Sequence, residues 1–218
     1  MNFALATGKK VKQQLQHNQK QVQTMIQTQN ETLGRILTDF NLADAGSTTG
    51  LELLGTTDSK YLRDLRINLS NALAYPNLTK KESYLVTLAV AINEKNENLV
   101  KAFTPLAEAE GASATEIAEL YSLVSLMNVN NVFYRFRHYT KNEYYTNTPA
   151  GIKMSIMMNP VLGKEFFELL SLAVSAINGC EMCVNAHEQS VKQHGATEAR
   201  IYDAIRLSSI VKGFSVLI

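Results

Sequence analysis

Helix-forming residues run through nearly the whole chain, and few residues interrupt them. The 218 residues include only 4 prolines, and long stretches are rich in Leu, Ala, Glu, Lys, Gln and Met. No convincing stretch shows the alternation of apolar and polar residues that is typical of a half-buried strand. These features together predict an all-α fold.

Two capping boxes mark the starts of helices. Thr79 is followed three residues later by Glu82, and Ser113 is followed by Glu116, so that each hydroxyl and each carboxylate can bind a free backbone amide. Glycines and prolines separate the other helical segments. We expect further helices over 59–73, 95–110, 148–158, 163–177, 180–194 and 197–212.

The N-terminal segment differs from the rest in composition. It is rich in Gln, and an apolar stripe from Val11 to Phe40, with spacings of three, four and seven, predicts one helix. That helix either docks on the main domain or a neighbouring subunit, or forms a short coiled coil, although polar residues interrupt the stripe. Residues 41–58, rich in Gly, Ser, Thr and Asp, are expected to form a loop. We therefore predict an N-terminal Gln-rich helical extension over 1–58 and a main domain over 59–218.

The main domain contains a weak internal repeat. When the sequence is shifted by 84 residues, Leu88-Ala-Val90 falls on Leu172-Ala-Val174. This register indicates a duplicated helical unit. The places of Cys180, Cys183 and His187 are taken by Asn, Leu and Phe in the first copy, so only the second copy carries reactive side chains.

Composition and charge exclude several classes of protein. The 21 Lys and Arg residues nearly balance the 20 Asp and Glu residues, so there is no basic excess to attract nucleic acid or an acidic membrane. The longest apolar run, Leu88 to Ile92, is far shorter than the roughly 20 residues of a membrane span. The N-terminus places its apolar patch before its positive charges, the reverse of a secretory signal. We expect a cytoplasmic protein that binds neither nucleic acid nor membrane.

The chain has 2 cysteines, Cys180 and Cys183, and cytoplasmic cysteines serve redox or metal chemistry more often than structural disulfides. Gly179 ends the preceding helix, which places both cysteines in the first turn of the next one, where free amides and the helix dipole favour a thiolate. The Cys-x-x-Cys spacing allows a local disulfide and is typical of redox-active dithiols. His187 follows four residues after Cys183 on the same face, close enough to exchange a proton.

Glu168 lies on the preceding helical segment, which is apolar on nearly all sides. The same face continues from Glu168 through Leu172 and Ser175 toward the cysteines. A partly buried carboxylate with a raised pKa would act as a general base through His187. The alternative is a carboxylate that reaches solvent at the start of its helix.

A metal site is the competing interpretation of Cys180, Cys183, His187 and His194. All four lie on one helix, and the ends of the set are about 21 Å apart at 1.5 Å per residue, so they cannot surround one ion. A site completed by another subunit stays open, as does the interpretation of both thiols as small buried apolar groups. We expect no metal and no tightly bound cofactor.

With these residues in place, the sequence resembles the AhpD family, the alkyl hydroperoxide reductase partner proteins within the wider carboxymuconolactone decarboxylase-like superfamily. The similarity covers roughly residues 60–218 and rests on four stretches. They are Met127-Asn-Val-Asn-Asn-Val-Phe-Tyr-Arg-Phe-Arg-His138, Met158-Asn-Pro160, Phe167-Glu-Leu169 and Ala173-Val-Ser-Ala-Ile-Asn-Gly-Cys180. The resemblance implies an all-helical, trimer-forming protein whose dithiol cycles with a disulfide.

The resemblance also implies a role for each site residue. Cys183 would be the attacking thiolate, which becomes a sulfenic acid or a mixed disulfide, and Cys180 its proton donor and resolving partner. Glu168 and His187 would relay protons. The implied activity is weak hydroperoxide reduction, together with electron transfer from dihydrolipoamide on a lipoylated acyltransferase to an AhpC-type peroxiredoxin. We therefore expect an antioxidant thiol oxidoreductase, a lipoyl-dependent peroxidase.

The sequence leaves alternatives open. A carboxymuconolactone-decarboxylase-like enzyme would not need two thiols, and a non-catalytic protein could use the disulfide only to change its assembly. Some members of the family carry a His at the position of Met182, where Met cannot relay a proton, although the adjacent Glu181 is ionisable. The stretch from Asn130 to His138 is expected either to pack at a subunit interface, or to line the approach to the dithiol or hold a partner.

Overall fold

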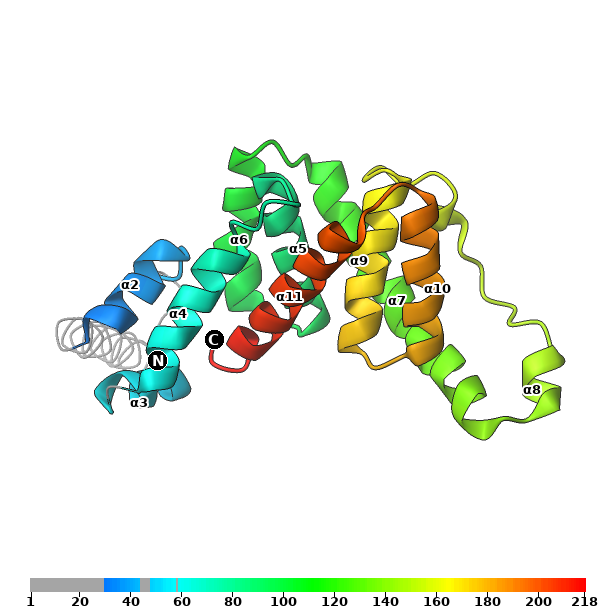
Figure 1. Ribbon diagram of the computed structural model, residues 1–218, viewed down its shortest axis with the longest axis horizontal. Coiled ribbons are helices and arrows are strands. Elements are labelled where there is room, and N and C mark those ends of the chain that lie inside the picture. The colour runs from blue at the N-terminus through cyan, green and yellow to red at the C-terminus, as the bar shows by residue number, and fades with distance from the viewer. Residues whose placement is uncertain (1–29, 44–47, 58) are drawn as a thin grey trace, which may run out of the picture. The chain divides into compact units, whose positions relative to one another are not determined.

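The computed structural model describes residues 30–43, 48–57 and 59–218 (Figure 1). These residues form α-helices and one short 3-10 helix, with no strand among them, so the predicted all-α fold is confirmed. The chain divides into two compact units, one of residues 1–66 with 217–218 and one of residues 67–216. The division falls within α4 (Lys60–Ala72), and the domain boundary expected at residue 58 stays a prediction.

Two helices pack closely in the first unit, α2 (Glu31–Asp39) and α3 (Thr49–Thr56). Asn30 caps α2 by accepting a hydrogen bond from the Leu33 amide, and its Nδ2 donates to the Gly55 carbonyl at 2.8 Å. A Cβ atom at Gly55 would lie 2.9 Å from the Leu33 side chain. Glycine at this position therefore permits the close approach of the two helices.

Two expectations for the N-terminal segment are wrong. Asn30 has an extended backbone, with φ −132° and ψ 102°, so the predicted single helix does not continue through it; residues 1–29 of that helix lie outside the described residues. Residues 41–58 are not all loop, because Thr48 caps α3 by accepting from the Leu51 amide. The apolar stripe is nevertheless buried in its described part, at Leu33, Ile36, Leu37 and Phe40.

The second unit contains two groups of helices that follow one another along the chain. The first group is α5 (Lys80–Asn93), α6 (Glu97–Ala109) and α7 (Ala114–Thr140), which leads to the short α8 (Glu143–Asn147). The second, after the 3-10 helix η1 (Ser155–Met157), is α9 (Lys164–Ile177), α10 (Glu181–Gln193) and α11 (Glu198–Ser215). Both predicted capping boxes are present, at the starts of α5 and α7.

The helix bounds match the predicted duplication. Adding 84 to the first residues of α5, α6 and α7, which are 80, 97 and 114, gives 164, 181 and 198, the first residues of α9, α10 and α11. The residue two positions before the middle helix is left-handed in both copies, Lys95 with φ 56° and Gly179 with φ 68°. The two copies therefore share one local fold, although only the second carries the cysteines.

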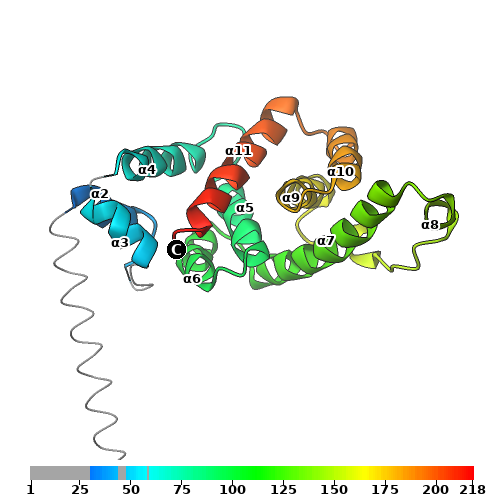
Figure 2. The ribbon, with the colours of Figure 1, turned by 90° about the horizontal axis from the view of Figure 1, so that it is seen from below.

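Helix α9 is the central helix of the second copy. It contacts α5, α7, α10 and α11, and Figure 2 looks almost along its axis, with α7, α10 and α11 around it. Every residue from Phe166 to Ser175 is buried. Glu168 is one of them, so a carboxylate lies inside the core of this unit.

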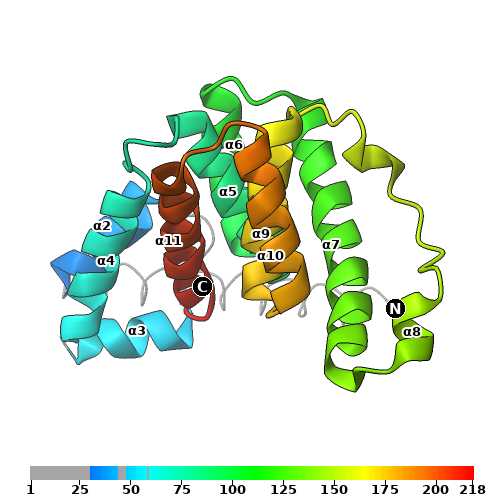
Figure 3. The ribbon, with the colours of Figure 1, turned by 45° about the vertical axis from the view of Figure 1, so that its right-hand side comes forward.

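The segment between α8 and α9, residues 148–163, is called the return segment below. Figure 3 shows it running back beside α7. The helix expected over 148–158 is wrong, because only η1 is helical there. Pro149 disfavours a helical backbone at Thr148, and Gly151 has φ 68°.

The return segment is fastened at both ends. The Arg137 side chain donates to the Thr148 carbonyl at one end. At the other, the Glu119 carboxylate accepts from the amides of Val161 at 2.8 Å and Leu162 at 2.7 Å.

Within the described ranges, no helix combines the length and apolar composition that a membrane crossing requires.

Candidate functional site

Cys180 and Cys183 form a disulfide at the start of α10, with their Cα atoms 5.3 Å apart. Cys180 is the N-cap residue, one position before the expected first turn, and Cys183 lies in that turn. Gly179 reverses the chain between α9 and α10 with a left-handed backbone, which glycine adopts without strain. The Cys180 amide donates to the Ser175 carbonyl at 3.1 Å, which ties the disulfide to the end of α9.

The two sulfur atoms have different surroundings. Cys180 is 0% exposed, whereas Cys183, 6% exposed, lines a cavity of about 270 Å³. The remaining lining residues come from α7, the return segment and α10: Asn130, Tyr134, Met154, Met157, Met182, Ala186 and His187. A molecule in this cavity therefore meets Cys183 and not Cys180, in mostly apolar surroundings.

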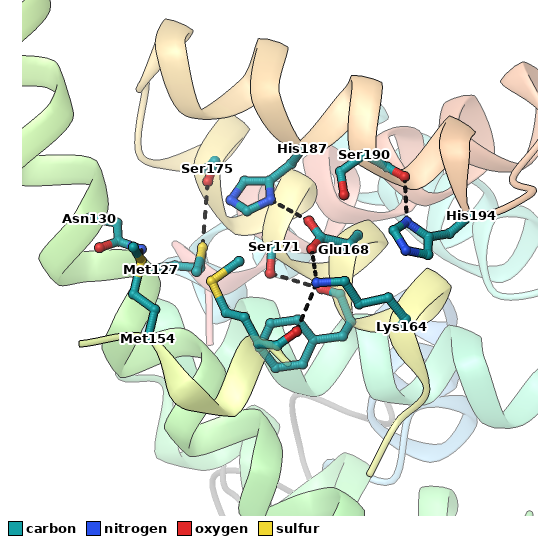
Figure 4. A network of polar contacts seen from close by, with 12 residues as sticks. Met127, Asn130, Met154, Lys164, Glu168, Ser171, Ser175, His187, Ser190 and His194 are labelled. Carbon is teal, nitrogen blue, oxygen red and sulfur yellow. Dashed lines mark hydrogen bonds and ion pairs between the residues drawn. The ribbon is translucent and has the colours of Figure 1, made fainter. Parts of the chain in front are cut away.

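Glu168 and His187 form a buried pair beside the cavity (Figure 4). The Nδ1 atom of His187 lies 2.7 Å from Oε2 of Glu168. The structure thus brings His187, Glu168 and the two cysteines together, as predicted. It adds Lys164, whose Nζ donates to Oε1 of Glu168 at 2.7 Å. Lys164 precedes Glu168 by four residues on one helix, a sequence signal that would have identified it.

The raised pKa expected for Glu168 is wrong. Burial by itself raises the pKa of this carboxyl, but the hydrogen bonds from His187 and Lys164 outweigh burial and lower the pKa to about 2. Glu168 is therefore ionised at neutral pH and accepts a hydrogen bond from Nδ1–H of His187. The Nε2 atom of His187 is left as the nitrogen that can exchange a proton with a group in the cavity.

The stretch 130–138 of α7 holds the turn that leads to the disulfide. The Nδ2 atom of Asn178 donates to Oδ1 of Asn131 at 2.9 Å, and Nη1 of Arg135 donates to the Asn178 carbonyl at 2.6 Å. Two other side chains of the same stretch line the cavity. This stretch therefore lines the approach to Cys183, one of the alternatives that the sequence leaves open.

The residues between the cysteines do not extend the proton path. Met182 presents a thioether to the cavity. The carboxylate of Glu181 lies 3.3 Å from Nε2 of His138 on α7. His194, the fourth residue of the metal hypothesis, donates from Nδ1 to the Ser190 carbonyl at 2.8 Å. In the part of the chain that the structure describes, no three His, Cys, Asp or Glu side chains are grouped to hold a metal ion.

Fold and site together define a class of protein, an all-helical protein with a Cys-x-x-Cys redox pair at a helix start and a Glu–His pair beside it. The model of the carboxymuconolactone decarboxylase family matches residues 145–217. Over most of its length the chain is similar to proteins named alkyl hydroperoxide reductase AhpD, and it belongs to the AhpD family.

Three of these relatives illustrate the similarity. The AhpD of Bradyrhizobium sp. (strain ORS 278) is 38% identical over 158 residues, which cover 72% of this chain and 87% of the relative. The AhpD of Brucella canis is 38% identical over 157 residues, covering 72% of this chain and 89% of the relative. That of Rhodopseudomonas palustris (strain BisA53) is 37% identical over 169 residues, covering 77% and 92%.

Proposed function

We propose that the protein is an antioxidant thiol oxidoreductase that reduces hydroperoxides with its Cys-x-x-Cys pair. The observation that carries the proposal is that Cys183, beside His187, lines the cavity, while Cys180 lies buried behind it. The name alkyl hydroperoxide reductase, borne by the relatives, supports an organic hydroperoxide as substrate. Flexible methionine side chains around Cys183 suit alkyl groups of different shapes.

The catalytic cycle has two steps before re-reduction. His187 takes the proton of the Cys183 thiol through Nε2, and the thiolate attacks the terminal peroxide oxygen, which breaks the O–O bond. The leaving alkoxide receives that proton and departs as an alcohol, and Cys183 becomes a sulfenic acid. The Cys180 thiol then displaces the hydroxyl as water and forms the disulfide. Glu168 keeps His187 in the required tautomer throughout.

Re-reduction requires two electrons and two protons to convert the disulfide back to two thiols, and one dithiol supplies both as it closes its own disulfide. We propose dihydrolipoamide, carried by a lipoylated acyltransferase, as this reductant. An AhpC-type peroxiredoxin is the proposed recipient when electrons leave the dithiol for a protein instead of a free peroxide. The cycle is placed in the cytoplasm, where reduced dithiols are available.

The proposed assembly is a homotrimer. Five large apolar side chains of α7 are exposed on one face of the helix: Tyr121, Val129, Val132, Phe136 and Tyr139. A contiguous apolar face of this kind marks an interaction surface. We assign it to further copies of this chain, because a net charge of +1 opposes association of identical subunits only weakly.

Stopped-flow kinetics of the reduced protein test the redox cycle. Cys183→Ser is expected to abolish both the oxidation by cumene hydroperoxide and turnover with dihydrolipoamide. Cys180→Ser is the matched control: it keeps the attacking thiol, so it should consume one equivalent of peroxide and stop at a sulfenic acid that dimedone traps. Unchanged turnover in Cys183→Ser would contradict the proposal.

Three experiments test the partners and the competing functions. Turnover with a lipoylated acyltransferase, measured with and without an AhpC-type peroxiredoxin, should rise when the peroxiredoxin is added. Decarboxylation of a carboxymuconolactone that survives replacement of both cysteines would favour a decarboxylase, although no Arg or Lys lines the cavity to bind the lactone's carboxylates. A change of mass between oxidised and reduced protein without any turnover would favour a redox-dependent assembly protein.

A further inference from the structure

Lys164 contacts both the proton relay, through Glu168, and the cavity wall, through Met157. Its Nζ donates to Oε1 of Glu168 at 2.7 Å and to the Met157 carbonyl at 2.8 Å. The other carboxylate oxygen of Glu168 binds Nδ1 of His187 at 2.7 Å. One carboxylate is therefore shared between a fixed ammonium group and the imidazole, as Figure 4 shows.

Met157 belongs to the wall of the cavity. It lies in η1, on the return segment, which also contributes Met154 to the lining. The Nδ2 atom of Asn130 donates to Sδ of Met154 at 3.2 Å. The wall opposite α10 is thus held in place partly by α7 and partly by Lys164, the same residue that contacts the proton relay.

The charge on Lys164 acts on the imidazole through the shared carboxylate. An ammonium group beside Glu168 compensates part of the carboxylate charge. The electrostatic attraction between that carboxylate and a protonated His187 is therefore weaker than it would be without Lys164. The groups that face His187 are Glu168 and Lys164 from α9, Tyr134 from α7, and Cys183 on its own helix. Lys164 is the only one of these with a permanent positive charge near neutral pH.

We propose that Lys164 is a positioning residue of the redox centre, which offsets the charge of Glu168 beside His187 and fixes the Met157 wall of the cavity. This inference deepens the proposed function, because it rests on His187 taking the thiol proton. The side chain of Lys164 is one-third exposed, at 34%, so its removal leaves no buried cavity in the core.

The test is the NMR titration of the His187 imidazole in the full-length, oxidised protein, in which neither cysteine titrates. In Lys164→Met, which keeps the length of the side chain and removes its charge, the midpoint should move upward. Lys164→Arg should restore most of the wild-type titration. Lys192→Met is the matched control, because Lys192 also binds two carboxylates, Glu188 and Glu198, away from the cavity.

The possible results distinguish a failure of the inference about Lys164 from a failure of the proposed function. An unshifted midpoint in Lys164→Met, or an equal shift in Lys192→Met, would overturn the inference. The acidic limb of the pH profile of turnover should move with the midpoint. A shifted titration with an unchanged pH profile would support the action of Lys164 on His187 and contradict proton transfer from Cys183 to His187, which belongs to the proposed function.

Discussion

Glu168 is a buried acceptor whose charge decides which nitrogen of His187 carries a proton. The substitution Glu168→Gln keeps the volume and can still accept from Lys164, but its amide then donates to Nδ1 of His187. The imidazole proton moves to Nε2, so His187 can no longer accept the proton of Cys183 while neutral. We expect oxidation of Cys183 by peroxide to slow about a hundredfold, the range of a lost general base.

Single-turnover stopped flow measures this loss. Glu188→Gln, one residue after His187, half-exposed and paired with Lys192, provides the control and should react at the wild-type rate. A Glu168→Gln variant that also reacts at the wild-type rate would remove Glu168 from the relay.

At the scale of residues, spacing in the sequence identified the groups that share a helix. Cys180, Cys183 and His187 follow one helical repeat, and the apolar neighbours of Glu168 predicted its burial. The predicted direction of the Glu168 pKa shift is wrong because hydrogen bonds from His187 and Lys164 oppose the effect of burial. The sequence marks the stretch of α7 that contains Asn130 and Tyr134 as one of two alternatives for the approach to the dithiol, whereas Met154 and Met157 carry no local signal because they meet the cavity only through tertiary packing.

At the scale of elements, one arginine holds three helices together. The Arg200 guanidinium on α11 donates to Glu82 of α5 at 2.6 Å and to Glu165 of α9 at 2.8 Å. Burial raises the pKa of Glu82, but hydrogen bonds from Arg200 and Thr79 lower it below its ordinary 4.5. A carboxyl whose pKa is lowered in the folded protein stabilises the fold when the pH is above the ordinary pKa of the carboxyl. This stabilisation is lost as the pH falls below that pKa.

We therefore expect Arg200→Met to lower the free energy of unfolding at neutral pH by about 2 kcal/mol, because it leaves two partly buried carboxylates unpaired. The difference from wild type should shrink as the pH falls below 4.5, where protonation of Glu82 begins to remove the negative charge that Arg200 compensates. Urea unfolding at neutral pH and at a pH below 4.5 measures this. Arg206→Met, on the same helix but half-exposed and 3.8 Å from its partner Asp203, should cost less than half as much. Equal costs at both pH values would contradict the assignment.

Helices could be predicted where caps and glycines mark their ends, but not at α3 or in the return segment. The bounds of α9, α10 and α11 lie within three residues of the expected ranges. Helix α3 lies within the expected loop 41–58, because a segment rich in Gly and Thr can still form a short helix when Thr48 caps it. The helix expected over 148–158 is wrong because Pro149 and Gly151, with φ 68°, break the helix there.

At the scale of the whole molecule, the duplication explains why one site exists in a repeated fold. Asn96 caps α6 with its side chain, accepting from the Leu99 amide at 2.9 Å, at the position where Cys180 begins α10. Leu99 and Phe103 are fully buried, so the first copy fills with apolar packing the places where the second has Cys183 and His187. The repeat supplies a scaffold for the second copy, whose cavity is completed by α7 and the return segment.

The proposed trimer is tested by placing a charge on the exposed face of α7. Val132 is 62% exposed and lies in the middle of that face, so Val132→Glu leaves the core intact but would bury a carboxylate in a subunit interface. We expect sedimentation equilibrium to give the mass of three chains for the wild type and of one chain for the variant, with unchanged helical circular dichroism. Tyr202→Glu is the control, since Tyr202 is 65% exposed on α11, away from this face, and should remain trimeric. A trimeric Val132→Glu variant would show that the subunits associate through another surface.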